Sequence, residues 1–245
     1  MSAAEGAASP RLTGRGMRRG ARRLAPVSLF VLPFGLAYGA AAVERGLSAA
    51  EAIVLSATVF AGAAQFAALD LWTTPLPYLS LAAVVFAVNA RHIILGAALS
   101  PWFNALPVRQ RMLALLLLSD ANFADARAAH RDGETDAGVL LGGGLVLWLA
   151  WVVGTALGAS FGAVMGDLAR FGVDVVMAAF FAAVVTLSVG TRRAAEPVVV
   201  ACVVAVATME VLPLGWNLIA AALAGGVVGA LRHDGRTGNG RRHGG

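Results

Sequence analysis

The chain has 245 residues and a formal net charge of +5, but only 13% of its residues are charged and 58% are hydrophobic. Soluble globular domains carry charges on about 25% of their residues. A mean hydropathy of +0.75 therefore excludes that class of protein. The apolar segments show no alternation of period two, which argues against membrane strands. The sequence predicts an all-α polytopic membrane protein.

Positive charge is concentrated in two terminal segments, and all of it is arginine. These residues are Arg11, Arg15, Arg18, Arg19, Arg22 and Arg23 at the start, and Arg232, Arg236, Arg241 and Arg242 at the end. Basic tails around a neutral apolar body fit the rule that such segments stay in the cytoplasm, and they argue against nucleic-acid binding. The only cysteine, Cys202, lies in an apolar stretch, so we expect no disulfide, metal site or cofactor.

Three regions follow from this pattern. We expect residues 1–23 to form a disordered basic cytoplasmic tail, residues 24–231 a transmembrane transport domain, and residues 232–245 a second disordered basic cytoplasmic tail. The apolar segment from Leu24 to Val43 is long enough to span a bilayer, which argues against a cleaved signal peptide.

A bundle of about eight transmembrane helices is expected from a window of about 20 residues. The segments are 25–43, 49–72, 77–99, 112–129, 137–160, 171–190, 197–212 and 215–231. The fourth contains charged residues and the seventh is short, so seven helices with one re-entrant segment is the alternative. With eight helices, the loop that holds Arg109 and Arg111 lies outside, against the positive-inside rule.

Pro33 and Gly35 interrupt the first apolar segment. Proline removes a backbone donor in mid-helix, and glycine adds conformational freedom beside it. We therefore expect the first helix to be discontinuous at Pro33–Gly35, with its freed carbonyls facing protein, water or a ligand. Discontinuous helices of this kind form the midplane sites of many transporters.

A stripe of glycines marks the fifth segment. Its members recur every four residues: Gly154, Gly158, Gly162 and Gly166. Such stripes let helix backbones approach closely. The stripe predicts either packing within the chain or docking of a partner, and the spacing alone favours packing.

Several polar side chains lie inside otherwise apolar segments, among them Gln65, Asn89, Arg91 and His92. Ionisable groups at membrane depth usually face the bundle interior or a wet cavity, because each buried charge is costly. Asp120 and Asp174 are the natural counter-charges for Arg91, although such a pair could merely pin helices together. His92 is the stronger functional candidate, since a neutral imidazole can take up a proton near physiological pH.

Six sequence blocks carry a resemblance to one family. They are "PFGLAYG" (33–39), "FAGAAQFAA" (60–68), "NARHIILGAALSP" (89–101), "SDANFA" (119–124), "LWLAWVVGTALG" (147–158) and "VDVVMAAFF" (173–181). In this order they resemble the AzlC family of branched-chain amino acid permeases, which includes YgaZ. The resemblance runs from about Ala25 to Leu231.

The resemblance implies a multi-pass protein of the bacterial inner membrane with both termini in the cytoplasm. It implies export of branched-chain amino acids such as valine, together with a small membrane subunit of the AzlD or YgaH type. It marks Pro33, Gly35, Gly62, Gln65, Asn89, Arg91, His92, Asp120 and Asp174. The family often has an acidic residue directly after the aspartate of the fourth segment, where this chain has Ala121, so Asp120 would act alone or recruit Asp125.

A mechanistic hypothesis joins the residues to the resemblance. The substrate zwitterion would be bound by Pro33, Phe34, Gly35, Gln65, Phe66 and Asn89. A coupling proton would be handled by Arg91, His92, Asp120 and Asp174. The glycine stripe of the fifth segment would pack helices or dock the small subunit.

Other functions remain as alternatives. A non-transporting scaffold predicts that intramembrane polar substitutions leave solute flux unchanged, and a passive channel predicts flux that does not saturate. An intramembrane serine hydrolase is a remote alternative, because "GASFG" (158–162) matches G-x-S-x-G around Ser160. That motif needs a strand–turn–helix context and a nearby base, and neither is indicated by the sequence.

Overall fold

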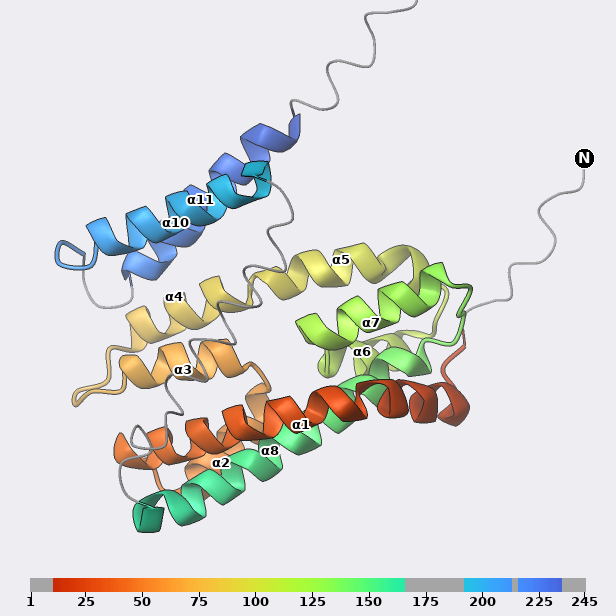
Figure 1. Cartoon of the computed structure of the whole chain (residues 1–245), viewed down its shortest axis with the longest axis horizontal. Coiled ribbons are helices and arrows are strands. Elements are labelled where there is room, and N and C mark those ends of the chain that lie inside the picture. Colours follow the sequence, from red (N-terminus) through yellow and green to blue (C-terminus); the bar gives the residue numbers. More distant parts are fainter. Residues whose placement is uncertain (1–10, 166–191, 213–215, 235–245) are drawn as a thin grey trace, which may run out of the picture. The chain divides into compact units, whose positions relative to one another are not determined.

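The computed structural model describes residues 11–165, 192–212 and 216–234, which fold mainly into helices (Figure 1). The chain divides into two compact units. One contains Met1–Gln65 and Asn89–Phe171, and the other contains Phe66–Val88 and Gly172–Gly245. The all-α fold predicted from the sequence is confirmed.

The first unit contains α1 (Gly14–Glu44), α2 (Ala49–Val59), the first turn of α3 (Gly62–Asp70), α5 (Arg91–Phe103), α6 (Val108–Leu116), α7 (Asp120–Arg131) and α8 (Gly138–Met165). The second contains the rest of α3, α4 (Tyr78–Asn89) up to Val88, α10 (Arg192–Ala207) and α11 (Trp216–Asp234). Three described helical stretches are long and apolar enough to cross a membrane: α1, Tyr78–Phe103 and Gly138–Phe161.

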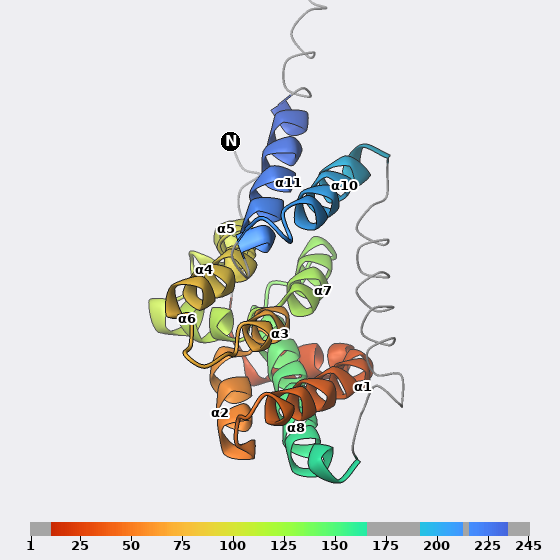
Figure 2. The same cartoon turned by 90° about the vertical axis from the view of Figure 1, so that its left-hand side faces the viewer.

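Helices α1 and α8 lie side by side and form the framework of the first unit (Figures 1 and 2). Their glycines make the contact close: a Cβ atom on Gly20 would overlap the Val139 backbone oxygen, and one on Gly39 would overlap the Thr155 oxygen. Residue numbers at the contacts increase in the same direction along both helices, from Gly20 with Val139 to Gly39 with Thr155. The two helices are therefore parallel, and their first residues lie at the same end of the unit.

The glycine stripe of α8 is used for this contact. A Cβ atom on Gly154 or Gly158 would overlap the backbone oxygens of Leu32 or Leu36 in α1. The helix-packing alternative therefore holds for these two glycines, and α1 occupies the surface on which a small subunit was expected to dock. Gly162 lies near the end of α8, and Gly166 falls outside the described residues.

The predicted break at Pro33–Gly35 is wrong, because α1 is a single helix from Gly14 to Glu44. Pro33 removes one backbone hydrogen bond, but it does not end the helix. The reason lies in the packing of α1 against α8. A Cβ atom on Gly35 would lie 2.5 Å from the Trp151 backbone oxygen, so α8 packs closely against α1 two residues after the proline. Pro33 itself is exposed on the other side.

The basic tail expected to be disordered is partly helical, because α1 begins at Gly14. Thr13 caps this end by accepting a hydrogen bond from the Gly16 amide, and its backbone N–H donates to Asp136 Oδ1 at 3.0 Å. Ion pairs hold the first turns: Arg19 reaches Glu134 at 2.6 Å, and Arg23 reaches Asp125 at 2.8 Å. The sequence prediction missed these partners because they lie more than 100 residues away.

The second predicted span is broken in the middle. Helix α2 begins at a capping box of Ser48 and Glu51 and ends at Val59. Its 11 residues measure about 16 Å, roughly half of the hydrocarbon thickness. Phe60 then adopts a left-handed conformation with φ of 38°, and α3 begins at Gly62.

The fourth predicted span is also wrong, because residues 112–129 belong to the two short helices α6 and α7. Ser119 ends the first apolar run and caps α7, and the buried Asn122 completes the capping box. Asn122 Nδ2 also donates to the Leu117 and Leu140 oxygens at 2.7 and 3.2 Å. These bonds hold the start of α7 against α8.

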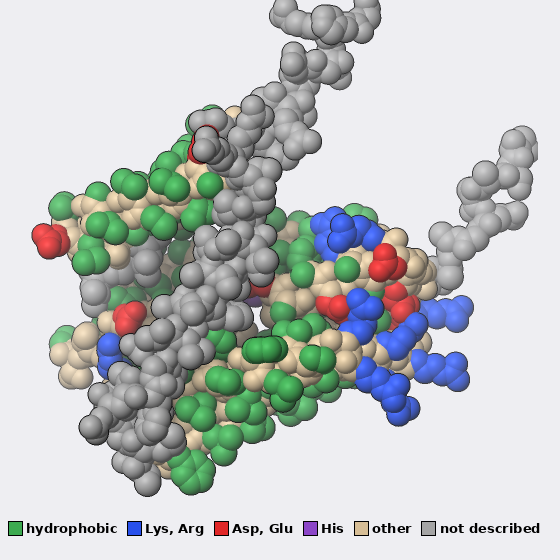
Figure 3. Space-filling model, in the orientation of Figure 1, with side chains coloured by type: hydrophobic (Ala, Val, Ile, Leu, Met, Phe, Trp, Pro, Cys, Tyr) green, Lys and Arg blue, Asp and Glu red, His purple; other side chains and the backbone are tan. Residues whose placement is uncertain are grey.

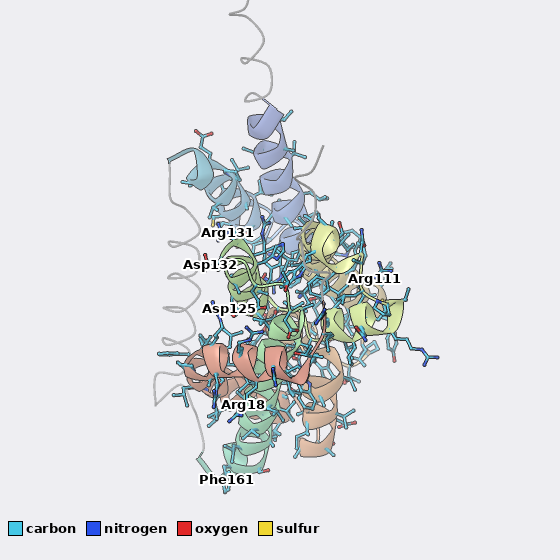
Figure 4. All side chains as sticks on the ribbon, turned by 90° about the vertical axis from the view of Figure 1, so that its right-hand side faces the viewer. Arg18, Arg111, Asp125, Arg131, Asp132 and Phe161 are labelled. Atoms are coloured by element: carbon cyan, nitrogen blue, oxygen red, sulfur yellow. The ribbon has the colours of Figure 1, made fainter. Side chains whose placement is uncertain are left out.

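This arrangement places α6 at the basic end of the first unit. The segment before α6 packs at the start of α8, where Phe103 and Leu106 share a core cluster with Ala137 and Leu140. The arginines of α6 therefore lie at the same end as the start of α1. Figure 3 shows most of the blue side chains gathered at one end of the first unit, and Figure 4 labels Arg18, Arg111 and Arg131 among the side chains seen from that end.

The parallel arrangement of α1 and α8 also constrains the chain between them. If both helices cross the membrane, the intervening chain must cross it an odd number of times. Among the described residues between them, Tyr78–Phe103 is the stretch with the length and hydropathy to do so.

The second unit contains a hairpin of α10 and α11, which correspond to the predicted seventh and eighth spans. A Cβ atom on Gly225 would lie 2.9 Å from the Pro197 backbone oxygen, so this glycine also serves helix packing. Trp216 Nε1 donates to Ser80 Oγ at 3.3 Å and ties the hairpin to α4. The predicted sixth span, 171–190, falls outside the described residues.

Candidate functional site

The break between α2 and α3 lies against the centre of α8. Trp148 Nε1 donates to the Ala57 oxygen in the last turn of α2 at 3.0 Å. A Cβ atom on Gly62, the first residue of α3, would lie 2.8 Å from the Trp151 ring. Because Trp148 and Trp151 occupy the middle of the apolar span Gly138–Phe161, the break sits at half its depth.

A buried polar network surrounds this break. Ser56 Oγ and Thr155 Oγ1 lie 2.7 Å apart, and Gln65 Nε2 donates to Ser56 Oγ at 3.2 Å. Trp151 Nε1 donates to Gln65 Oε1 at 3.0 Å, and the Tyr38 ring stacks on Trp151 with centroids 5.8 Å apart. All five side chains are buried. The network therefore joins α1, α2, α3 and α8 at one depth.

Gln65 was predicted to bind substrate, and the structure places it at the break but with its amide engaged at both ends. Direct binding would require these bonds to open. The geometry assigns Gln65 a positioning role, because it links the last turn of α2 to α8. The sequence prediction missed Ser56, Thr155 and Trp151, although hydroxyl groups inside apolar segments are the same kind of signal that marked Gln65.

The third predicted span contains a second interruption, at Ala90 between α4 and α5. His92 Nδ1 lies 3.1 Å from the Asn89 backbone oxygen. Because a carbonyl oxygen can only accept, Nδ1 carries the proton and donates this bond. In the neutral tautomer Nε2 then keeps its lone pair, so His92 can accept a proton at that atom.

Asn89 supplies an unusual polar atom at this interruption. Its side-chain Oδ1 is buried and has no hydrogen-bond partner among the described residues. Buried acceptors in native structures are nearly always paired, so an orphan acceptor needs an explanation. Asn89 Oδ1 is therefore an acceptor that a donor could still occupy.

Arg91 forms the predicted ion pair with Asp120, with Nη1 3.2 Å from Oδ2. The two side chains are 44% and 58% exposed, so this pair is accessible rather than sealed. The position of this pair along α8 follows from Asn122, which lies two residues after Asp120. Asn122 Nδ2 donates a hydrogen bond to the Leu140 oxygen near the start of α8. Leu140 and Trp151 are separated by about 16 Å along α8, so the pair and the α2–α3 break lie at different depths.

The other predicted site residues lie in different surroundings. Pro33 is exposed, Phe34 is half-buried and Gly35 is buried against α8. Phe66 belongs to the second unit, and Asp174 falls outside the described residues. The predicted substrate site around Pro33 therefore stays a prediction.

The break offers both polarities that a zwitterion needs. The last carbonyls of α2 lack partners within their helix and carry the negative end of its dipole. The first amides of α3 carry the positive end of the next dipole. Among the described residues, no group of three His, Cys, Asp or Glu side chains is placed to hold a metal ion. The backbone groups at the break are hydrogen-bond acceptors at the end of α2 and donors at the start of α3.

Ser160 lies inside the continuous helix α8 and is exposed. The nucleophile-elbow motif places its serine on a sharp turn between a strand and a helix. That context is not present around Ser160. The G-x-S-x-G match around Ser160 therefore lacks the strand–turn–helix context of that motif.

Comparison with known proteins gives a family. An uncharacterized membrane protein of Archaeoglobus fulgidus is 32% identical over 57% of this chain and 60% of its own length. The inner membrane protein YgaZ of Escherichia coli K12 is 28% identical over 56% of this chain and 57% of its own. The branched-chain amino acid transport protein AzlC of Bacillus subtilis is 27% identical over 64% and 61%.

The chain thus spans about three fifths of the length of these relatives. No solved structure is significantly similar to it. The family model described as AzlC protein matches residues 26–165, which include α1 from Pro26, both helix interruptions and α8. This match covers more than half of the chain, which therefore belongs to the AzlC family.

Proposed function

We propose that the chain exports branched-chain amino acids such as valine across a bacterial inner membrane, driven by proton coupling. The name of the Bacillus subtilis relative supports the substrate class, and the name of the Escherichia coli relative supports the membrane. The basic end formed by α1, α6 and α7 would face the cytoplasm, in keeping with the positive-inside rule. A small AzlD- or YgaH-type membrane subunit would act with the chain.

One observation carries the proposal: a membrane helix is broken at Phe60–Ala61 against the centre of α8. Free backbone groups are expensive in lipid, so a break at this depth is tolerated where it contacts protein or lines a cavity. The α3 amides would receive the substrate carboxylate, and the α2 carbonyls would receive the ammonium. Asn89 Oδ1, at the separate interruption at Ala90, would accept a hydrogen bond from the solute on its path.

Proton coupling would use His92 and the Arg91–Asp120 pair. The Nδ1–H of His92 is committed to the Asn89 oxygen, so the exchangeable proton would reside on Nε2. His92 shares this contact with the residue that would hold the substrate. Protonation and substrate release would thereby be coupled through the interruption at Ala90.

Efflux of labelled valine from proteoliposomes under an imposed pH gradient tests this proposal. We expect saturable wild-type efflux that the gradient accelerates. His92→Ala should abolish the acceleration, because the proton acceptor is lost, and Gln65→Ala should lower the maximal rate by about tenfold by loosening the break. Both variants are compared at matched protein level and with Arg109→Gln, an exposed change on α6, as the control.

The remaining outcomes separate the alternatives. Flux that rises linearly with valine concentration would indicate a passive channel. Valine flux no faster than in empty liposomes, with and without a co-reconstituted small subunit, would favour a scaffold. Wild-type, gradient-dependent rates in both His92→Ala and Gln65→Ala would discard the proposed site.

A further inference from the structure

The start of α1 carries a row of arginines that the first unit does not neutralise. Helix α1 has 31 residues and a length of about 46 Å, whereas about 20 residues suffice to cross the hydrocarbon core. The excess lies at residues 14–23, before the segment that matches the family model. This part of the helix would therefore emerge at the headgroup level.

The arginines of this segment fall into two groups. Arg19 and Arg23 pair with Glu134 and Asp125 and hold α1 against its neighbours. Three others are exposed and make no ion pair with any described residue: Arg15, Arg18 and Arg22. Together with Arg19 they line a shallow groove of about 450 Å³.

The exposed row continues into an apolar surface. Arg15, Arg22 and Leu29 are spaced by seven residues, which is close to two helical turns, so they share one face of α1. Leu29 is 72% exposed and its neighbour Phe30 is 68% exposed. This face thus presents guanidinium groups at its outer end and an apolar strip directly beyond them.

We propose that this face is a docking site for an anionic phospholipid. Its phosphate and any further headgroup charge would contact Arg15, Arg18 and Arg22, and its acyl chains would lie along Leu29 and Phe30. Guanidinium groups bind phosphate through paired hydrogen bonds, which suits this chemistry. The site is independent of the transported solute, so its test does not depend on the proposed function.

Lipid titration of the purified full-length chain in a non-ionic detergent tests the proposal. Phosphatidylglycerol and phosphatidylcholine with identical acyl chains are added, and bound lipid is counted by native mass spectrometry. We expect the wild type to prefer phosphatidylglycerol by at least about tenfold, since each basic residue at a membrane surface contributes a factor of about five. Arg15→Gln/Arg18→Gln/Arg22→Gln should reduce this preference to less than about twofold.

Two variants separate the site from net charge and from folding. Arg15→Lys/Arg18→Lys/Arg22→Lys keeps the charge but loses the paired hydrogen bonds, so its preference should lie between those of the wild type and the glutamine variant. Arg109→Gln/Arg127→Gln/Arg131→Gln removes the same charge from exposed positions of α6 and α7 and should leave the preference unchanged.

Three results would overturn the proposal. One is an unchanged preference in the glutamine variant, or in Arg18→Gln if the triple variant does not fold. Another is an equal loss in the α6 and α7 variant, which would reduce the effect to net charge. The third is binding of glycerol 3-phosphate as tight as that of phosphatidylglycerol, which would indicate a site for a soluble anion.

Discussion

Gly158→Ala should destabilise the protein by at least about 2 kcal/mol, in spite of adding only one methyl group. The new Cβ atom would overlap the Leu36 carbonyl oxygen, which belongs to the backbone of α1 and cannot rotate away. The two helices would have to separate, and the close packing along α1 and α8 would be lost with them. Thermal unfolding in detergent measures the effect, which should lower the Tm by about 5 °C or more.

Gly96→Ala is the matched control for this substitution. Gly96 lies inside α5, and no atom lies within 4 Å of the position that its Cβ would take. Alanine is favoured over glycine in a helix by up to about 1 kcal/mol, so this variant should be neutral or more stable. A Gly158→Ala variant as stable as Gly96→Ala would contradict the close contact of α1 with α8.

Breaking the Arg91–Asp120 pair should lower valine efflux by at least about tenfold in either single variant, Arg91→Gln or Asp120→Asn. The pair joins the start of α5 to the start of α7 across 3.2 Å. Removing one member leaves the other charge without its partner and removes this contact between α5 and α7. Efflux per mole of folded protein is the measurement.

The reversed pair, Arg91→Asp/Asp120→Arg, distinguishes attraction from side-chain identity. If the ion pair positions the two helices, the reversal should recover at least about a third of the lost rate, as expected for coupled sites. If a single member acts on the proton directly, the reversal should stay as inactive as the single variants. Wild-type rates in both single variants would remove the pair from the account.

The sequence was sufficient to predict the elements that depend on composition and spacing. Long apolar runs predicted α1 and α8, and glycines spaced by four predicted that Gly154 and Gly158 lie in a close helix contact. Asp120 and Asp174 were predicted as counter-charges for Arg91, because opposite charges in apolar surroundings have few other partners, and the structure pairs Arg91 with Asp120.

The positions of the helix breaks could not be predicted in the same way. Proline at position 33 suggested a break, but close contact with α8 keeps α1 continuous through it. The break at Phe60 has no proline, and it depends on Trp148 and Gln65 bonds to residues distant in the sequence. The helix start at Ser119 was also missed, because the mean hydropathy of residues 112–129 predicted one continuous span. Ser119 and Asn122, three residues apart, form the capping box that begins α7.

The central claim is that the α2–α3 break lies on the path of the solute, and cysteine accessibility tests it most directly. In a Cys202→Ala background, Phe60→Cys places a thiol at the partly exposed break, and Leu29→Cys places one on the exposed apolar face of α1. A small, membrane-impermeant thiol reagent should label position 60 but not position 29, and saturating valine should slow that labelling by at least about fivefold. No labelling at position 60 from either side of the membrane, or a rate that valine leaves unchanged, would contradict the claim.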